Sequence, residues 1–399
     1  MTPTRLSSIA TAVTRAALIA GSLAGCVGAA PVGTTPSSPT TVPTGTTPTA
    51  PASSQATGQP AAADPRAERI ELTFMGDVMF GGTFSGRFVP QDVEANDPLT
   101  EVEALIASDL PLANLETTVV SEIPVARMKG NLRFAATPGQ VAALPRHGIK
   151  TVTIANNHAN DLDGAGVTET PTHLDQLGID FIGGFVRKAP VFRAETIEVK
   201  GWKIAFIAAT TKLNRPQKPG DPVVPLVDIA DLQATLVPVI EGARAGHDLV
   251  IVVLHWGVQY SDTPLPEQVA AARAFIDAGA RAVIGHHPHI LQAAERYKDG
   301  LIAYSLGNFV FQNAVKGQRD TGVLRLGFSR DGAGCIDLVA FHPAIMRGRP
   351  VHHPVPATGA EFDDIARKVA KLSSTAPFST RWTASGDRLT TPAPCPRPQ

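Results

Sequence analysis

The sequence predicts an α/β domain with mixed β-sheets, preceded by a long segment without regular structure. Apolar runs of strand length alternate with segments of helical periodicity from Ile70 onward, which favours an α/β fold. The hairpin-like stretch 192–208 indicates that at least one sheet contains antiparallel neighbours. With 399 residues, 43% of them hydrophobic, the chain can bury a large core. The first 66 residues are instead rich in Thr, Pro, Ser, Ala and Gly.

The first 25 residues have the layout of a secretory signal peptide. Arg5 and Arg15 precede an apolar stretch that is too short to span a bilayer. The stretch ends in Leu23-Ala24-Gly25-Cys26, which resembles the lipobox of bacterial lipoproteins. We therefore expect a signal peptide at 1–25 and a lipid on Cys26 that anchors the chain to the extracytoplasmic face of the cell membrane. The alternative is an ordinary cleaved signal with an incidental cysteine.

Residues 26–66 are predicted to form a Thr/Pro/Ser-rich tether. This composition buries too little apolar surface to offset the entropy of ordering the backbone. With Cys26 lipidated, Cys335 and Cys395 remain as one candidate disulfide in an oxidising compartment. The sequence has no CxxC pair, so zinc-finger and thioredoxin-like sites have no support.

Organised sequence begins at Ile70, where apolar residues alternate with polar ones as in a strand that runs into Asp77. Further strands are predicted at 151–155, 202–208, 249–254, 282–284, 301–304 and 323–328. Helices are predicted at 99–108, 138–147, 228–243 and 266–278. In the first of these, Thr100 and Glu103 have the spacing of a capping box. The domain is expected to cover 67–346, followed by a Pro-rich extension, 347–399, whose structure the pattern leaves open.

Charge and motif content exclude several functions. The 35 Lys and Arg residues nearly balance 36 Asp and Glu residues, so no basic field is available to bind nucleic acid. The sequence contains no GxxxxGK[ST] loop, HExxH, GxGxxG or GxSxG motif. Nucleotide kinases, zincins, dinucleotide-binding enzymes and α/β-hydrolases are therefore unsupported.

Polar side chains follow several apolar runs at the point where a strand would end. In open α/β sheets, ligands bind at the carboxyl ends of strands. The residues are Asp77, Glu116, Asn156, Asn157, His158, Asp161, Asp163, His255, His286, His287 and His289. Singly, most of them are explained by turns, helix caps or loops. The histidine cluster alone favours a metal, because imidazoles are costly to bury unpaired. Together they offer the mixed nitrogen and oxygen ligands of a Mn, Fe or Zn site.

The motif series resembles that of the CapA family of poly-γ-glutamate capsule synthesis proteins over about residues 70–330. The motifs are Gly76-Asp77, Asn114-Leu115-Glu116, Asn156-Asn157-His158, His255-Trp256-Gly257, His286-His287-Pro288-His289 and Ser305-Leu306-Gly307-Asn308. The resemblance implies a metallophosphoesterase-like, four-layer αββα sandwich of two mixed β-sheets with a metal centre at strand ends. One departure is Gln259, where the family usually has glutamate.

The resemblance also implies roles for these residues. His158 would be an acid or a transition-state stabiliser that does not bind metal, and Asp161 would fix its tautomer. Ser305 and Asn308 are either site-lining groups or plain turn residues. Either His286 or His287 could coordinate, and the His-x-His spacing favours His287. The ligands of one or two divalent ions would be Asp77, Glu116, Asn157, His255, His287 and His289. The residues that line the substrate site would be Asn156, His286, Ser305 and Asn308.

These roles predict an extracytoplasmic metal-dependent hydrolase of capsule synthesis. Its substrate would be a phosphoester or an amide-linked anionic polymer at the cell surface, and its partners a capsule synthesis complex. The alternative is a non-catalytic component that binds or exports the polymer, using Arg127, Lys129 and Arg133 as a basic lip; the same residues could equally form a solvated loop. A surface antigen with a decayed site is a third interpretation.

Overall fold

The computed structural model describes residues 68–84, 87–128, 132–185, 191–312, 317–330, 334–348 and 351–395. The predicted signal peptide, the lipidation site Cys26 and the tether lie outside the described residues. None of the helices in the described ranges is long and apolar enough to cross a membrane.

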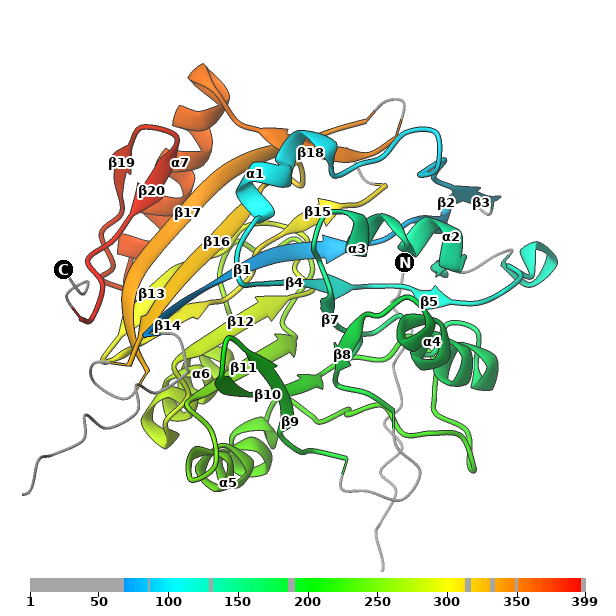
Figure 1. Ribbon diagram of the computed structural model, residues 1–399, viewed down its shortest axis with the longest axis horizontal. Coiled ribbons are helices and arrows are strands. Elements are labelled where there is room, and N and C mark those ends of the chain that lie inside the picture. Colours follow the sequence, from blue (N-terminus) through cyan, green and yellow to red (C-terminus); the bar gives the residue numbers. More distant parts are fainter. Residues whose placement is uncertain are drawn as a thin grey trace, which may run out of the picture. The chain divides into compact units, whose positions relative to one another are not determined.

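Two mixed β-sheets form the centre of the described domain (Figure 1). The first has the strand order β19-β20-β17-β16-β1-β4-β7-β8, and β15 and β18 pair with β1 and β17. Strands β1, β4, β7 and β8 run parallel, whereas β16 pairs antiparallel with β1 and β17 pairs antiparallel with β16. The strands are β1 (Arg69–Val78), β4 (Leu110–Leu115), β7 (Thr151–Thr153), β8 (Asp180–Ile182), β15 (Asn308–Val310), β16 (Asp320–Ser329), β17 (Cys335–Arg347), β18 (His353–Pro356), β19 (Thr383–Ser385) and β20 (Arg388–Thr390).

The second sheet has the order β13-β14-β12-β11-β10-β9. Its four central strands are parallel, and both edge strands pair antiparallel. The strands are β9 (Glu195–Val199), β10 (Trp202–Thr210), β11 (Leu249–His255), β12 (Ala282–His286), β13 (Ala294–Tyr297) and β14 (Gly300–Ala303). The predicted hairpin at 192–208 is the β9–β10 pair. Two small sheets pair β2 (Gly81–Phe84) with β3 (Arg87–Pro90) and β5 (Thr118–Val119) with β6 (Ala135–Ala136).

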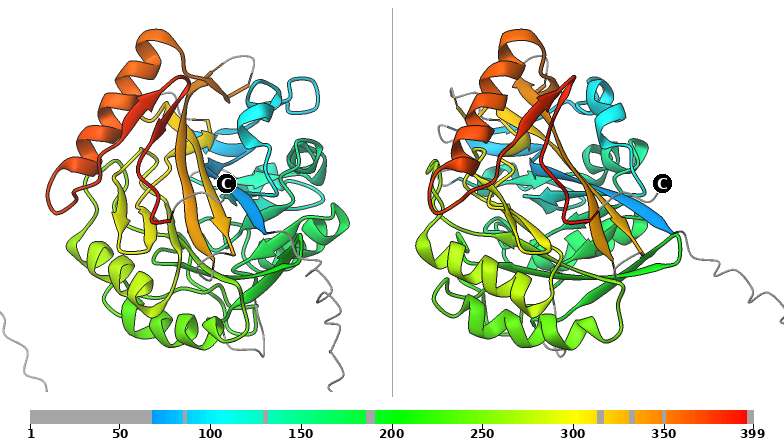
Figure 2. Two further views of the ribbon diagram at one scale, coloured as in Figure 1. Left: turned by 60° about the vertical axis from the view of Figure 1, so that its left-hand side comes forward. Right: turned by 90° about the vertical axis from the view of Figure 1, so that its left-hand side faces the viewer.

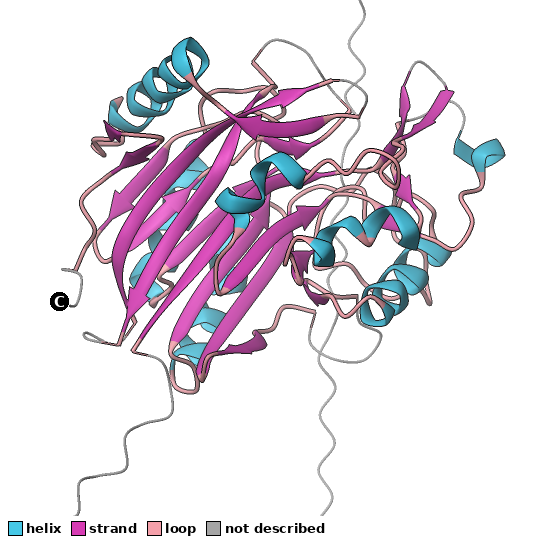
Figure 3. Ribbon diagram, turned by 45° about the horizontal axis from the view of Figure 1, so that its top comes forward, coloured by secondary structure: helices cyan, strands magenta, loops and turns pink. Residues whose placement is uncertain are grey.

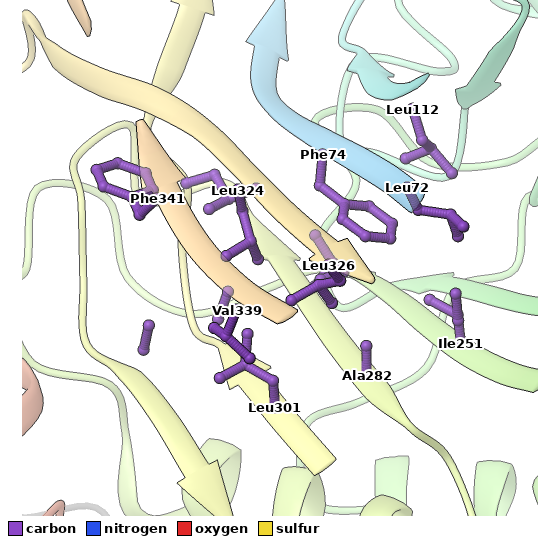
Figure 4. Packing of buried hydrophobic residues seen from close by; sticks show 14 of the residues in the cluster. Leu72, Phe74, Leu112, Ile251, Ala282, Leu301, Leu324, Leu326, Val339 and Phe341 are labelled. Carbon is purple, nitrogen blue, oxygen red and sulfur yellow. The ribbon is translucent and has the colours of Figure 1, made fainter. Parts of the chain in front are cut away.

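The two large sheets pack face to face through one apolar core (Figure 4). Leu72 and Phe74 of the first sheet share this core with Ile251 of the second. Alternate residues of a strand face opposite sides of the sheet. Thus Phe206 of β10 points into this core, whereas its neighbour Ile207 faces the opposite side.

Helices cover the outer face of each sheet. On the second sheet these are α5 (Leu232–Arg244) and α6 (Pro266–Ala278) (Figure 2). They contribute Leu236 and Phe275 to the outer core. On the first sheet, α4 (Gly164–Gln176) contributes Leu174. Figure 3 shows the helices beside the strands of the described domain. The short segments η1 (Thr100–Val102), α1 (Glu103–Ile106), α2 (Pro138–Val141) and α3 (Ala143–Arg146) cover the same face, and η2 (Val125–Met128) lies in the loop after β5. The expected αββα arrangement of two mixed sheets is confirmed.

Two predicted helices are shorter than expected. The stretch 99–108 forms only η1 and α1, and Thr100 makes no capping box because Leu99 occupies the N-cap without a side-chain hydrogen bond. The chain leaves the helix at Ala107, three residues before β4 begins, which leaves no room for further turns. The stretch 138–147 is divided at Ala142 into α2 and α3. The helix predicted at 266–278 has the observed bounds of α6.

Residues after Arg347 continue the first sheet. Strands β18 and β20 both pair with β17, and α7 (Gly359–Ser374) buries Ile365 and Val369 on its inner face. Cys335, the first residue of β17, forms a disulfide with Cys395, which ties the end of the described chain to this sheet. The described part of the predicted extension is therefore structured and packed on the domain.

Gly76 allows β1 to pass closely beside the segment that precedes β15. A Cβ atom at this position would lie 2.1 Å from the carbonyl oxygen of Gly307, and that contact is backbone, which cannot rotate away. We expect Gly76→Ala to lower the free energy of unfolding by about 1–3 kcal/mol, measured by urea denaturation. Gly242→Ala is the matched control, since nothing surrounds that exposed helical position and alanine favours helix. An unchanged urea midpoint for Gly76→Ala would contradict this account of the motif.

Candidate metal centre

Parallel strands of both sheets deliver their last residues to one place. Asp77 of β1 is in register with Asn114 of β4 on one side and with Asn308 of β15 on the other. In the second sheet, His255 at the end of β11 is in register with His286 at the end of β12. Because the strands are parallel, their carboxyl ends meet at one edge, as expected for a ligand site in an α/β domain.

The segment after β12 brings the backbone of His287 and the imidazole of His289 to Asp77. His287 has φ of 97° and His289 has φ of 59°, a left-handed conformation that is costly for a residue with a Cβ. The backbone N–H of His287 donates to Asp77 Oδ2 over 3.4 Å. His289 Nδ1 lies 3.2 Å from the same oxygen. Strained backbone of this kind is typical of functional sites, where the surroundings hold it in place.

Two groups of three candidate ligands share Glu116. In the first, His255 Nε2 lies 3.5 Å from Glu116 Oε1, and His287 Nδ1 lies 3.0 Å from His255 Nε2. In the second, Glu116 is joined by Asp77 and His289. Within each group the ligand atoms lie within 4.8 Å of one another. A carboxylate common to both groups is suited to bridge two ions.

The carboxylates of this cluster are strongly perturbed. Both carboxylate oxygens of Glu116 are buried and accept no hydrogen bond from any described residue. Burial and the negative charges of Asp77 and Asp161 raise the pKa of Glu116 well above its usual value. For Asp77, burial alone would raise the pKa, but the imidazoles of His286 and His289 lower it well below its usual value. A cation beside Glu116 would supply the partner that its carboxylate lacks.

Two of the imidazoles, those of His255 and His287, are held in the neutral form, which is the form that binds metal. Burial, followed by the neighbouring charge of His287, lowers the pKa of His255 well below its usual value. Burial and His289 lower the pKa of His287 to about 3. The donor set of buried carboxylates and imidazoles fits a divalent metal ion.

Asn157, the predicted amide ligand, has a side-chain oxygen without a hydrogen-bond partner among the described residues. Its Oδ1 is buried and accepts no hydrogen bond from the described residues. Its Nδ2 donates to Asn214 Oδ1 over 3.2 Å, and the backbone N–H of Asn214 donates to the carbonyl oxygen of Asn157 over 3.1 Å. Asn214 thus fixes which end of the Asn157 amide remains for a metal. No sequence motif marks Asn214, because it lies in a loop.

Loss of Asn214 should weaken metal binding without removing a ligand. We expect Asn214→Ala to lower the affinity for Mn²⁺ by about 10–100-fold, as is usual when the partner of a ligand is lost. Titration calorimetry on the purified protein measures this change. Gln233→Ala, at an exposed position of α5, is the control. Equal affinities for Asn214→Ala and the control would show that Asn214 does not orient Asn157.

His158 and Asp161 form a buried pair beside the ligand cluster. His158 Nδ1 lies 2.6 Å from Asp161 Oδ2, a short distance typical of a charge-assisted hydrogen bond. The Phe134 ring stacks on the His158 imidazole with the two ring centroids 3.6 Å apart. The backbone N–H of Phe134 donates to Asp161 Oδ2 over 2.6 Å. His158 Nε2 lies 3.8 Å from Glu116 Oε1. The pair thus directs one ring nitrogen toward the cluster, and Phe134, which the sequence did not mark, fixes the ring plane.

The four residues predicted to line the substrate are buried beside the candidate ligands. Asn156, His286 and Asn308 are fully buried, and Ser305 is 2% exposed. His286 Nδ1 lies 3.2 Å from Asp77 Oδ1, and Asn308 Oδ1 lies 2.9 Å from His289 Nδ1. Asn156 Nδ2 donates to Asn114 Oδ1, and the Ser305 hydroxyl accepts from the backbone of the following turn. These bonds hold candidate ligands and loops in place, and a substrate-lining role for the four residues stays a prediction.

Two other sequence features lie at the rim. Gln259 is exposed, and its Nε2 lies 3.4 Å from His289 Nε2. Of the predicted basic lip, Lys129 and the side chain of Arg127 lie outside the described residues. Arg133 lies beside the buried pair, where its Nη1 donates to the carbonyl oxygen of Asp161 over 3.2 Å.

A layered α/β domain with a buried carboxylate–imidazole centre at its strand ends defines this chain as a candidate metalloprotein of the α/β class. Residues 71–313 match the family described as "Bacterial capsule synthesis protein PGA_cap", and the chain belongs to that family. The family resemblance of its motifs is thereby confirmed.

The chain is similar to proteins named for capsule and polyglutamate synthesis. It is 29% identical over 269 residues to the capsule biosynthesis protein CapA of Bacillus anthracis. The matched region covers 65% of this chain and 62% of that protein. It is 27% identical over 335 residues to the PGA biosynthesis protein CapA of Bacillus subtilis, covering 80% and 82%. The chain therefore spans less than two thirds of the first relative's length.

Two solved structures are also similar. The calcineurin-like phosphoesterase YfkN from Bacillus subtilis has a TM-score of 0.35 at 12% identity, over 76% of this chain and 97% of that one. A 5'-nucleotidase from Candida albicans has a TM-score of 0.37 at 14% identity, over 64% and 47%.

Proposed function

We propose that this chain is an accessory protein of capsule polymer synthesis whose buried centre binds one or two divalent metal ions and hydrolyses an anionic substrate. The bond cleaved is a phosphoester or the amide of a cell-surface polymer such as poly-γ-glutamate. The observation that carries the proposal is the pair of ligand groups sharing Glu116, whose carboxylate oxygens accept no hydrogen bond from the described residues, beside the buried His158–Asp161 pair.

The residues present fit such a metal, which would be Mn, Fe or Zn. The ligands would be Asp77, Glu116, Asn157, His255, His287 and His289. A bound divalent ion would act as a Lewis acid toward a phosphoryl or carbonyl oxygen, and it would lower the pKa of a bound water to near neutrality. His158 would deliver a proton to the leaving group through Nε2, while Asp161 accepts from Nδ1 and keeps the ring in that orientation.

The proposed location is the extracytoplasmic face of the cell membrane. Acylated Cys26 would hold the chain to the membrane, and residues 26–66 would let the domain reach a polymer near the surface. The disulfide between Cys335 and Cys395 supports this location, because such bonds persist in oxidising compartments. The names of the relatives support a partner complex that makes or exports a capsule polymer.

A non-catalytic, polymer-binding role is the second candidate. Gln259 favours it, because a neutral amide lies beside His289 at the rim, where the family usually has a carboxylate. If that carboxylate serves as a base, this chain would bind its polymer without cleaving it.

Turnover separates the two candidates. Purified protein is incubated with an aryl phosphate, a phosphodiester and poly-γ-glutamate, with Mn²⁺ or with a chelator. We expect hydrolysis of one of them that needs Mn²⁺ and disappears in Asp77→Asn. Bound metal without turnover on any of the three would overturn the hydrolase and support the binding role, with Gln259→Glu as the next variant.

A further inference from the structure

The loop that follows β10 carries a lysine to the edge of the candidate metal centre. Thr210, the last residue of β10, is in register with His255. The backbone N–H of Thr211 donates to the carbonyl oxygen of His255 over 2.9 Å. The Thr210 hydroxyl donates to the carbonyl oxygen of Lys212 over 2.8 Å. These bonds fix the backbone of Lys212 beside a strand end that holds a candidate ligand.

The same loop contacts the site again two residues after Lys212. Lys212 and Asn214 are exposed, and Leu213 between them is partly buried in an apolar cluster. Asn214 Nδ2 lies 3.2 Å from His158 Nε2, so the loop is held at the candidate centre on both sides of Lys212. The charge of Lys212 also contributes to the lowered pKa of His287.

Within the described part of the chain, Lys212 differs from the other cations of its loop in having no acidic partner. Arg215 and Lys218 both pair with Asp163, at 3.4 and 3.0 Å. Among the described residues, no carboxylate lies within 4.0 Å of the Lys212 ammonium. Its charge is therefore not neutralised by an ion pair within the described chain.

The two described side chains beside His289 at the rim carry no negative charge. Gln259 is neutral, and Tyr260 is 52% exposed with its ring 6.0 Å from the ring of His289. His287 is 5% exposed, more than the other candidate ligands at 0–3%.

We propose that Lys212 recognises an anionic group of the substrate, a phosphoryl or carboxylate group, at the mouth of the metal centre. This inference rests on the proposed function and adds a determinant of specificity to it. Lys212 binds the group as a point charge with three rotatable donors. A phosphoester supplies such a group itself, and a γ-glutamyl chain supplies an α-carboxylate next to each amide.

Anion binding tests the inference without relying on turnover. The full chain is loaded with Mn²⁺, its metal content is measured, and inorganic phosphate or γ-glutamyl-glutamate is titrated in by calorimetry. The variants are Lys212→Gln, Lys212→Arg and, as a control on the exposed surface of α7, Lys371→Gln. We expect Lys212→Gln to lose about tenfold in affinity for at least one anion at unchanged metal content, or about 1.4 kcal/mol. Lys212→Arg keeps most of the affinity because it keeps the charge.

The outcomes separate this inference from the proposed function. Equal affinities of Lys212→Gln and wild type for both anions, or no binding of either anion to wild type, overturns the role of Lys212. If wild type holds none of Mn²⁺, Fe²⁺ and Zn²⁺, the metal-dependent function fails. The same titrations on the metal-free protein then test the role of Lys212. A tenfold loss of anion affinity in Lys212→Gln supports that role, and an unchanged affinity overturns it. A preference for phosphate or for the dipeptide identifies which anion the site takes.

Discussion

Asp77→Asn is expected to lower the affinity for Mn²⁺ by more than about a hundredfold, which exceeds the usual effect of losing only the partner of a ligand. The substitution keeps the shape of a side chain that accepts from Asn114 over 2.8 Å, and it removes the charge that faces His286 and His289. The domain should therefore fold while the centre loses its ability to hold a divalent ion. Metal content after gel filtration measures the effect.

The matched control for this prediction is Asp277→Asn. Asp277 lies on α6, where it pairs with Lys298 at the exposed surface. The Asp277→Asn variant should retain full metal content and turnover. Full metal content in Asp77→Asn would mean that the candidate centre is not the metal site.

His158→Ala is expected to reduce kcat by about 10²–10⁴-fold while metal content stays at the wild-type level. The physical reason is that His158 Nε2 faces the cluster but the ring is held by Asp161 and Phe134, so its loss removes a proton donor and no ligand. Steady-state kinetics on the substrate found by the turnover panel, together with metal analysis, measures both quantities.

A double variant sharpens this prediction. Because Asp161 acts through His158, the pair should not be additive, and His158→Ala combined with Asp161→Asn should be no slower than His158→Ala alone. Additive losses would assign Asp161 a separate role. Loss of metal in His158→Ala would make His158 a ligand and refute its assignment as an acid.

Much of the site could be predicted from sequence because its ligands follow apolar strands directly. His255 ends the apolar strand β11, and His287 and His289 follow β12. Parallel pairing then brings these ends together without any information on long-range contacts. The bounds of helix α6 could likewise be predicted from local sequence, because a proline in its first turn and Gly279 after its last residue mark the two ends.

The parts that the sequence did not predict depend on tertiary contacts. Helix α4 contains Pro171 and several threonines, which are poor helix formers, and it is stabilised by burial of Val167 and Leu174. Asn214 and Phe134 reach the site from loops far along the chain, so no spacing marks them. The burial of His286 was not apparent either, because a cluster of three histidines does not show which ring faces inward.

The most direct test of the central claim is anomalous X-ray diffraction from crystals of the protein grown with Mn²⁺. The predicted result is one or two anomalous peaks among the candidate ligands. Each peak lies next to Glu116, and the surrounding ligands are Asp77, Asn157, His255, His287 and His289. A fully occupied Mn²⁺ elsewhere with this cluster empty, or no bound Mn²⁺, Fe²⁺ or Zn²⁺ in parallel crystals, would contradict the assignment of these residues as a metal centre.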